Sequence, residues 1–180
     1  FFKTHEGTTA IANQAFMEIN SLTEIEIEEG VTSIGENAFT GCGSLTDVRI
    51  GESVTSIGDE AFRYCESLEE IVIPDSVTEI RNYAFQNCSA MQTADLGGVV
   101  TIGEYAFRGC SKIEAINASG ITSAGTGSFA GCRGITEIDL SSLKYMLPPE
   151  LLADCKMLES VKLNSTVERI EKSAFVNCIA

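Results

Sequence analysis

Seven cysteines recur at an almost constant interval, and this interval constrains the fold of the chain more than any other feature. Successive cysteines are separated by 22 or 23 residues, as subtraction of their positions shows. A period of this length identifies a solenoid, in which one structural unit is repeated and each unit packs only against its neighbours. The cysteines that define the period are Cys42, Cys65, Cys88, Cys110, Cys132, Cys155 and Cys178.

A large apolar residue precedes each cysteine by three positions, and a small residue usually precedes that one. Ala38 and Cys42 are four residues apart, a spacing that places both on one face of a helical turn. The segment is too short for an independent helix, so we expect a single turn of α-helix or 3-10 helix in each unit. The apolar residues are Phe39, Phe62, Phe85, Phe107, Phe129, Leu152 and Phe175.

Each unit opens with a pattern typical of a β-strand. In the first unit, Leu22 is followed by Ile25 and Ile27, whose spacing of two indicates a strand with one buried face. A second apolar pair follows at a spacing of three, as in Val31 and Ile34. We therefore predict one domain over residues 1–180, with a half-repeat at 1–21 and seven repeats that begin at positions 22, 45, 68, 91, 113, 135 and 158.

The repeated pattern Leu-x-x-Ile-x-Ile-Pro-x-x-Val-x-x-Ile-Gly-x-x-Ala-Phe-x-x-Cys resembles the BspA-like (treponemal-type) leucine-rich repeats. The segment from Leu68 to Cys88 is the best copy, with Pro74 in place and Arg81 where the family usually has glycine. The resemblance covers essentially the whole chain. It implies a secreted or surface protein of bacteria or of some protists, with a role in adhesion to host proteins or to other cells.

These features predict an α/β repeat solenoid, a right-handed leucine-rich-repeat arc with one parallel sheet on its concave face and short helical or 3-10 turns on its convex face. Stacking of the units in register places Phe on Phe and Cys on Cys, which closes a core that no single unit could enclose. A β-helix is the rival architecture. The single strand pattern in each unit and the Ala-Phe-x-x-Cys turn favour leucine-rich repeats.

Two units depart from the pattern. The unit that begins at Ile113 has the glycine-rich segment 124–128 in its turn, and we expect this turn to be weaker than the others. The unit that begins at Ile135 has a Pro-Pro pair at 148–149, where a proline starts a helical turn without losing a needed N–H group. We expect a local bend or an altered loop in that unit.

The odd number of cysteines leaves at least one of them unpaired in any disulfide pattern. Neighbouring cysteines in stacked units have Cα atoms about 5 Å apart, within disulfide range, but their side chains should all point into the core. Free cysteine behaves as a small apolar residue, so equal placement in every unit favours a buried ladder of thiols. Zinc binding is not expected, because the chain has no Cys-x-x-Cys pair and no histidine near the cysteines.

The chain has 26 acidic and 12 basic residues, which give a net charge of −14. A surface this acidic repels phosphate backbones and anionic lipid headgroups, so nucleic acid and direct lipid binding are both disfavoured. The longest apolar runs are only a few residues, as in Gly98-Val99-Val100, too short to insert into a bilayer. The charge instead suits a basic protein partner, with carbohydrate as an alternative ligand.

No residue set typical of an enzyme, a cofactor site or a metal site is found in the repeats. His5 is the only histidine and precedes the first full repeat, so a nucleophilic triad has no base in the body of the chain. Glu24, Asp47 and Glu70 fall side by side on adjacent predicted strands, at the ~5–9 Å separation of glycosidase carboxylates. They face open solvent with nothing to raise one pKa. A calcium site from the same acids has no Asp-x-Asp-x-Asp-Gly loop to support it.

The solvent-facing positions of the predicted strands form the candidate binding surface. Extended concave surfaces are what solenoids use for binding, and an acidic one would steer a basic partner. An equal alternative is that these acids keep an exposed sheet soluble. No aromatic stripe runs along these positions. The candidate residues are Glu24, Glu26, Glu28, Asp47, Arg49, Glu70, Val72, Asp95 and Asp139.

Neither end of the chain has the polar cap that solenoids need. We therefore expect either a segment of a longer repeat protein or a protein that associates end to end. No leader peptide opens the chain, so the expected extracellular or cell-surface location rests on the resemblance. The favoured function is a non-enzymatic protein-binding or adhesion module that uses the concave face. The alternatives are a structural spacer in a larger surface protein and, less favoured, a carbohydrate-active enzyme.

Overall fold

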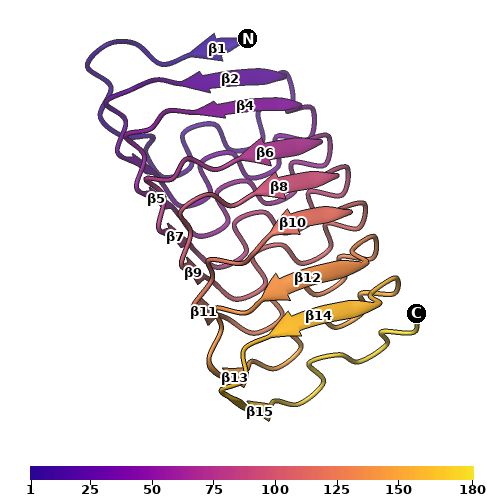
Figure 1. Ribbon diagram of the computed structural model, residues 1–180. Helices are drawn as coiled ribbons and strands as arrows, with labels where there is room; N and C mark the ends of the chain where they lie inside the picture. The colour runs from indigo at the N-terminus through magenta and orange to yellow at the C-terminus, as the bar shows by residue number, and fades with distance from the viewer.

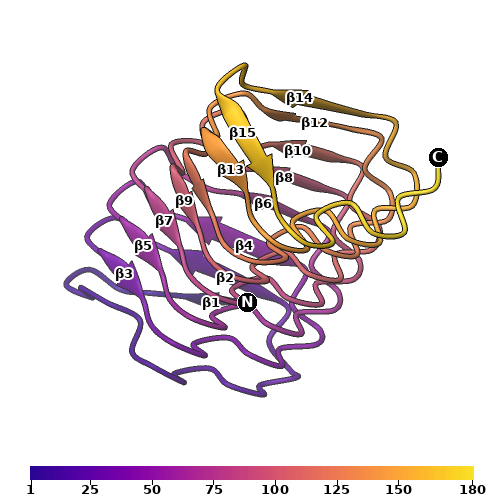
Figure 2. The same ribbon diagram turned by 90° about the horizontal axis from the view of Figure 1, so that it is seen from below.

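The computed structural model describes residues 1–180 and contains fifteen β-strands and no helix. Each repeat makes one turn of a solenoid and contributes two strands, which form two series of parallel strands on different sides of the coil (Figure 1, Figure 2). The main series comprises β1 (Phe2–Lys3), β2 (Glu24–Ile27), β4 (Asp47–Ile50), β6 (Glu70–Val72), β8 (Thr93–Asp95), β10 (Ala115–Asn117), β12 (Glu137–Leu140) and β14 (Ser160–Leu163).

The strands of the second series are shorter. Ladder hydrogen bonds join β3, β5, β7, β9 and β11 into one five-stranded sheet and pair β13 with β15. The main series divides into three sheets, β1-β2-β4, β6-β8-β10 and β12-β14. All pairs are parallel and most are offset by one repeat, as in Ile25 opposite Val48 and Ile34 opposite Ile57. The second series comprises β3 (Ser33–Ile34), β5 (Ser56–Ile57), β7 (Glu79–Ile80), β9 (Thr101–Ile102), β11 (Ser123–Ala124), β13 (Tyr145–Leu147) and β15 (Val167–Ile170).

The prediction of a repeat solenoid with stacked parallel strands is confirmed, but the prediction of an α/β class with a single parallel sheet was wrong. The apolar pair represented by Val31 and Ile34 forms the second sheet, in which Ile34 points into the core and Ser33 is half-buried. These strands are mostly two residues long. A strand this short has no alternation of side chains that could be recognised in the sequence.

In each repeat, a turn follows the second strand and surrounds the buried apolar residue. The outer surface of these turns is here called the turn edge, and it comprises residues 37–41, 60–64, 83–87, 105–109, 127–131 and 150–154. The residues two before and two after Phe39 lie in the left-handed region, with φ of 55° at Asn37 and 74° at Gly41. The N–H of Ala38 donates to the carbonyl of Gly35 at 3.3 Å, which closes a single turn. The expected α or 3-10 turn was wrong, because left-handed residues stop such a turn from continuing as a helix.

Peptide groups at the turn edge bond to the next repeat in one constant direction. The N–H of Phe16 donates to the carbonyl of Ala38 at 2.8 Å. The N–H of Phe39, which belongs to the same peptide group as that carbonyl, donates to the carbonyl of Ala61 at 2.7 Å. Similar columns run through the left-handed residues on either side. The third side of the coil is therefore hydrogen-bonded between repeats although it contains no strand.

Phenylalanine rings form a continuous stack through the core. Phe39, Phe62 and Phe85 are fully buried, and their ring centroids are 5.0 and 5.2 Å apart. The interplanar angles of 8° and 3° show that the rings are nearly parallel, as one-repeat stacking requires. The stack runs from Phe16 to Phe129, after which Leu152 takes the ring position and Phe175 is only half-buried.

The cysteines form a second buried column beside the rings. All seven are free thiols, and each Sγ donates to a backbone carbonyl of the preceding repeat, as Cys65 does to Phe39 at 3.3 Å. Burial raises the pKa of the Cys65 thiol, and it raises that of Cys155 to about 12. Only Cys178 is half-buried. The column therefore consists of neutral thiols that fill space and bond to the backbone.

The repeat that begins at Ile135 has an altered second strand, in line with the bend or altered loop predicted there. The register of β13 against β15 shifts between Tyr145 and Met146, where Tyr145 has a left-handed φ of 65°. The side chain of Tyr145 is 66% exposed. Pro148, which follows β13, is buried.

The ring stack generates a stability prediction. Replacement of Phe85 by Ala should lower the free energy of unfolding by about 3–5 kcal/mol, because it removes a fully buried ring and leaves a cavity between two neighbours. Urea denaturation of the Phe175→Ala variant provides the matched control and should show a smaller loss, because Phe175 is half-buried. Equal losses in the two variants would contradict the continuous stack.

The thiol column generates a second prediction. In the native protein at pH 8, iodoacetamide should label Cys178 first and leave the six buried cysteines almost unmodified, because the neutral thiol is a poor nucleophile. In denaturant, all seven cysteines should react. Mass spectrometry of the labelled peptides measures the rates. Rapid native labelling of Cys88 would refute a closed core.

Candidate functional site

The outward side chains of the main series form one surface, here called the main-sheet face. Its residues alternate with buried ones along each strand and stack in columns one repeat apart, as Glu24 beside Asp47 and Glu26 beside Arg49. The strands that carry this surface lie side by side from β1 to β14 in Figure 1. The face comprises Glu24, Glu26, Asp47, Arg49, Glu70, Val72, Thr93, Asp95, Ala115, Asn117, Glu137, Asp139, Ser160 and Lys162, with Glu28 just beyond β2.

Six of the nine predicted binding residues line two adjoining depressions at the N-terminal end of this face, and Glu24 lines neither. One has a volume of about 470 Å³ and is lined by Glu26, Glu28 and Arg49 among others. The other, also about 470 Å³, is lined by residues that include Arg49, Glu70 and Val72. Arg49 lines both depressions and therefore separates them.

Two of the predicted residues lie farther along the face. Asp95 lines a third depression together with Val72, in which Ala115 and Asn117 of β10 also take part. Asp139 lies on β12, beyond β10, in a depression of about 380 Å³ that Glu137 and Lys162 also line and that shares Ala115 with the third one. The depressions therefore adjoin one another along the face.

Lys3 is a residue of this face that the sequence analysis missed. Its Nζ lies 2.7 Å from a carboxylate oxygen of Glu26 and 2.7 Å from one of Glu28. The hydrogen bonds to Glu26 and then Glu28 raise the pKa of Lys3. The signal was present, because Lys3 precedes Glu26 by one period and β1 pairs with β2 in that register. The first acidic residues are thus partly neutralised.

Ion pairs divide the remaining acids into two groups. Asp47 is paired with Arg49 at 3.4 Å and Asp139 with Lys162 at 2.7 Å. Glu24, Glu70 and Asp95 have no ion pair. These three acids therefore keep their full charge available for a partner.

Val72 is the exposed apolar residue at the centre of the face. Its residue surface is 63% exposed, on the strand between Arg49 and Asp95. Protein interfaces have an apolar core within a polar rim, and Val72 with its charged neighbours is a small example of that distribution. The depressions along this face are all open to solvent.

The carboxylates of Glu24, Asp47 and Glu70 are the residues that the least favoured alternative assigned to catalysis. Glu24 and Asp47 lie in register on β2 and β4, and Glu70 begins β6. All three are at least partly exposed on an open surface. No group of three His, Cys, Asp or Glu side chains is arranged to hold a metal ion.

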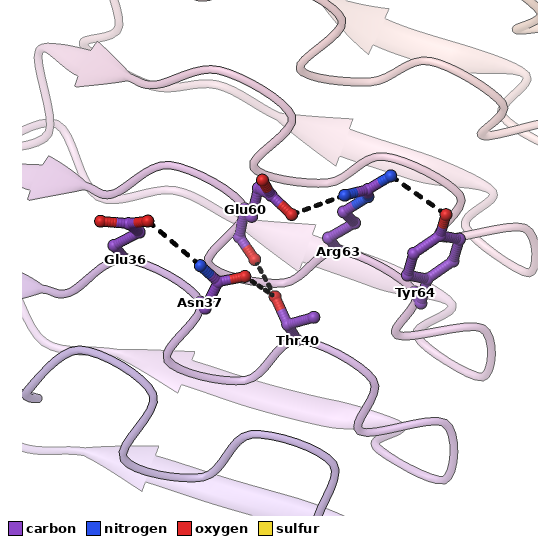
Figure 3. Close-up of polar contacts among 6 residues, drawn as sticks. All are labelled: Glu36, Asn37, Thr40, Glu60, Arg63 and Tyr64. Carbon is purple, nitrogen blue, oxygen red and sulfur yellow. Dashed lines mark hydrogen bonds and ion pairs between the residues drawn. The ribbon is translucent and has the colours of Figure 1, made fainter.

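A cluster of polar and aromatic side chains lies at the turn edge, where the sequence analysis placed no site (Figure 3). Arg63 donates to a carboxylate oxygen of Glu60 at 2.6 Å and to the hydroxyl of Tyr64 at 3.1 Å. The hydroxyl of Thr40 donates to the side-chain oxygen of Asn37 at 3.1 Å and to the backbone carbonyl of Glu60. The cluster therefore joins the turns of two neighbouring repeats.

Aromatic rings continue this cluster along the turn edge. The guanidinium of Arg63 lies 4.7 Å from the ring centre of Tyr64 and 5.8 Å from that of Tyr83. The ring of Tyr83 stacks on Tyr105 at 5.6 Å, and Arg108 lies over Tyr105 at 5.2 Å. These aromatic residues could have been recognised in the sequence, because each of the tyrosines lies two residues from a buried phenylalanine.

The chain matches the family model for the BspA-type leucine-rich repeat region (6 copies) over residues 2–100 and 95–180. Among solved structures, the T. pallidum leucine-rich repeat protein is similar with a TM-score of 0.66 and 23% identity, over 95% of this chain and 70% of that one. A leucine-rich cell surface protein from Faecalibacterium prausnitzii A2-165 has a TM-score of 0.60 and 18% identity, over 98% and 79%.

At these identities the two structures show a shared fold. No curated protein matches the chain. The structure has no helix with the length and apolar character needed to cross a membrane.

The Asp139–Lys162 pair generates a pH prediction. Hydrogen bonds from Lys162 and from Ser141 lower the pKa of Asp139 to about 2. The stabilisation is therefore present above the ordinary carboxyl pKa of about 3.9 and is lost as the pH falls toward 2. In Lys162→Met, NMR titration should show the pKa of Asp139 rising toward the ordinary value. Lys144→Met, which removes an exposed lysine with no ion pair, should leave it unchanged.

Proposed function

Because the chain belongs to the BspA-type leucine-rich repeat family, we propose that it is a non-enzymatic protein-binding or adhesion module that acts at a bacterial cell surface through its main-sheet face. Proteins built from such repeats are typically non-catalytic. The similar protein from Faecalibacterium prausnitzii is a leucine-rich cell surface protein, which supports the location. The open main-sheet face supports the mode of action.

The observation that carries the proposal is the grouping of Val72 with unpaired acids. Glu70 and Asp95 keep their charges free of ion pairs, and they flank Val72 on its own strand and on β8. Together they offer an apolar contact of modest size with negative charge on either side. This arrangement favours a partner that presents an apolar side chain between lysine or arginine residues.

The spacer function remains the second candidate, and the ion pairs of Lys3 and Lys162 favour it. Both lysines neutralise acids on the same face, which fits a sheet that is kept soluble and monomeric rather than prepared for a basic partner. The two candidates differ in one respect. Only the binding module loses a partner when the unpaired acids are changed.

Charge reversal of the unpaired acids tests the proposal. The variant Glu24→Lys, Glu70→Lys, Asp95→Lys should lose at least tenfold in affinity for proteins that the wild type captures from an array of extracellular domains, because disrupting a close charge pair across an interface costs about 2–5 kcal/mol. Surface plasmon resonance at low and high salt measures the affinity. Binding by the wild type should weaken as the salt concentration rises.

A matched variant controls for net charge. Glu66→Lys, Glu104→Lys, Glu168→Lys makes the same change in charge at exposed positions away from the main-sheet face, and it should keep the affinity of the wild type. Equal losses in the two variants would mean that overall charge governs capture. Absence of any captured protein would favour the spacer.

A further inference from the structure

The turn edge contains a hollow beside two successive glycines, Gly109, over which the Asn87 side chain lies, and Gly131, over which no side chain lies. The left-handed position two residues after the buried ring carries Tyr64 and Asn87 in the second and third repeats, and Asp154 in the sixth. In the repeats between them this position is Gly109 and Gly131, with φ of 76° and 75°. The two successive glycines form part of the lining of a depression of about 370 Å³, which Asn87 and Asp154 also line.

Two arginines that form no ion pair line this hollow. Arg108 and Arg133 are both exposed, and neither lies within ion-pair distance of a carboxylate. The acids beside them are already engaged: Asp154 accepts a hydrogen bond from the Asn177 amide at 2.9 Å, and Glu150 accepts one from the Tyr105 hydroxyl at 3.3 Å. Glu150 and Asp154 balance the charge of the two arginines, whose guanidinium N–H donors remain free of carboxylate partners.

Neighbouring residues hold Arg108 in place. Its guanidinium lies 5.2 Å from the ring centre of Tyr105, which stacks on Tyr83 at 5.6 Å. A Cβ atom at Gly127 would lie 2.4 Å from the Tyr105 ring, so the ring occupies the space above that glycine. The glycine-rich turn that was expected to be weak is therefore covered by Tyr105, the ring over which Arg108 also lies.

The lining identifies the class of ligand. Two guanidinium groups favour a carboxylate, which arginine can bind through paired N–H donors. The amide of Asn87 and the hydroxyl of Ser111 can exchange hydrogen bonds with hydroxyl groups. Only two alanines supply apolar contact, and no free strand edge lies in the hollow, so peptide recognition by strand addition or by a helix in an apolar groove has no support.

We propose that this hollow binds the carboxylate-bearing sugar of an acidic polysaccharide. The uronate carboxylate pairs with Arg108 and Arg133, and the ring hydroxyls bond to the polar lining. Lys156 follows Cys155 as Arg133 follows Cys132, so it places a further cation one repeat along the edge. Because Arg133 and Lys156 occupy equivalent positions in repeats stacked about 4.8 Å apart, they present two cations at a spacing suited to successive units of a linear polymer. This site is separate from the main-sheet face.

Titration calorimetry with an oligogalacturonate tests the proposal. The wild type should bind it saturably, and the Arg108→Gln, Arg133→Gln variant should bind at least tenfold more weakly. The fully methyl-esterified oligomer has the same rings without charge and should bind as weakly to the wild type as the acid does to that variant. Arg169→Gln removes an exposed arginine outside the hollow and should bind like the wild type.

A second variant tests the hollow without removing a charge. Gly131→Asn places a side chain in the space, and it should fold because asparagine tolerates the left-handed region and already occupies the equivalent position at Asn87. It should lose binding while its thermal midpoint stays close to that of the wild type. Unchanged binding in Gly131→Asn would overturn the assignment to this hollow.

Further outcomes would overturn the proposal as a whole. No saturable binding by the wild type, or equal binding of the methyl ester, would rule out uronate recognition. Equal or tighter binding of a poly-glutamate peptide would assign the site to acidic peptides. The Glu24→Lys, Glu70→Lys, Asp95→Lys variant should still bind the oligogalacturonate, so failure of the main-sheet proposal and failure of this one can be told apart.

Discussion

Hydrogen bonding between repeats at an offset of one period is the constraint on which the structure depends. It acts on three sides of the coil, through the main strands, the short second strands and the turns. Because every side is bonded at the same offset, each side chain lies above its equivalent in the preceding repeat. The ring stack, the thiol column and the columns of the main-sheet face all follow from that single offset.

The sequence predicted what depends on the period and on burial. It identified the repeats, the parallel solenoid, the stacked Phe and Cys, and a resemblance to BspA-type repeats that the family match confirms. It did not predict the second sheet or the form of the turns. Asn37 and Tyr83 adopt a left-handed φ and their N–H groups bond to the next repeat, and no local signal in the sequence reveals either feature.

The candidate site divides in the same way. The register placed Glu24 beside Asp47 and Glu26 beside Arg49, and these neighbours could be read from the period. Lys3 could have been read in the same way, but a strand of two residues gives almost no pattern. Which acids remain unpaired depends on side-chain conformation. The hollow at the turn edge depends on which repeats have glycine at a left-handed position. It could be recognised as a candidate site only once the structure placed Arg108 and Arg133 in its lining.

The direction of the turn-edge bonds has an electrostatic consequence for the whole molecule. In each column the same peptide group accepts from the preceding repeat and donates to the following one, so its dipole points the same way in every turn. Each peptide dipole is about 3.5 D, and aligned dipoles add, as they do along an α-helix. Chains of hydrogen bonds also polarise one another. One edge of this helix-free protein therefore has a macrodipole along the solenoid axis, positive toward the C-terminal repeats.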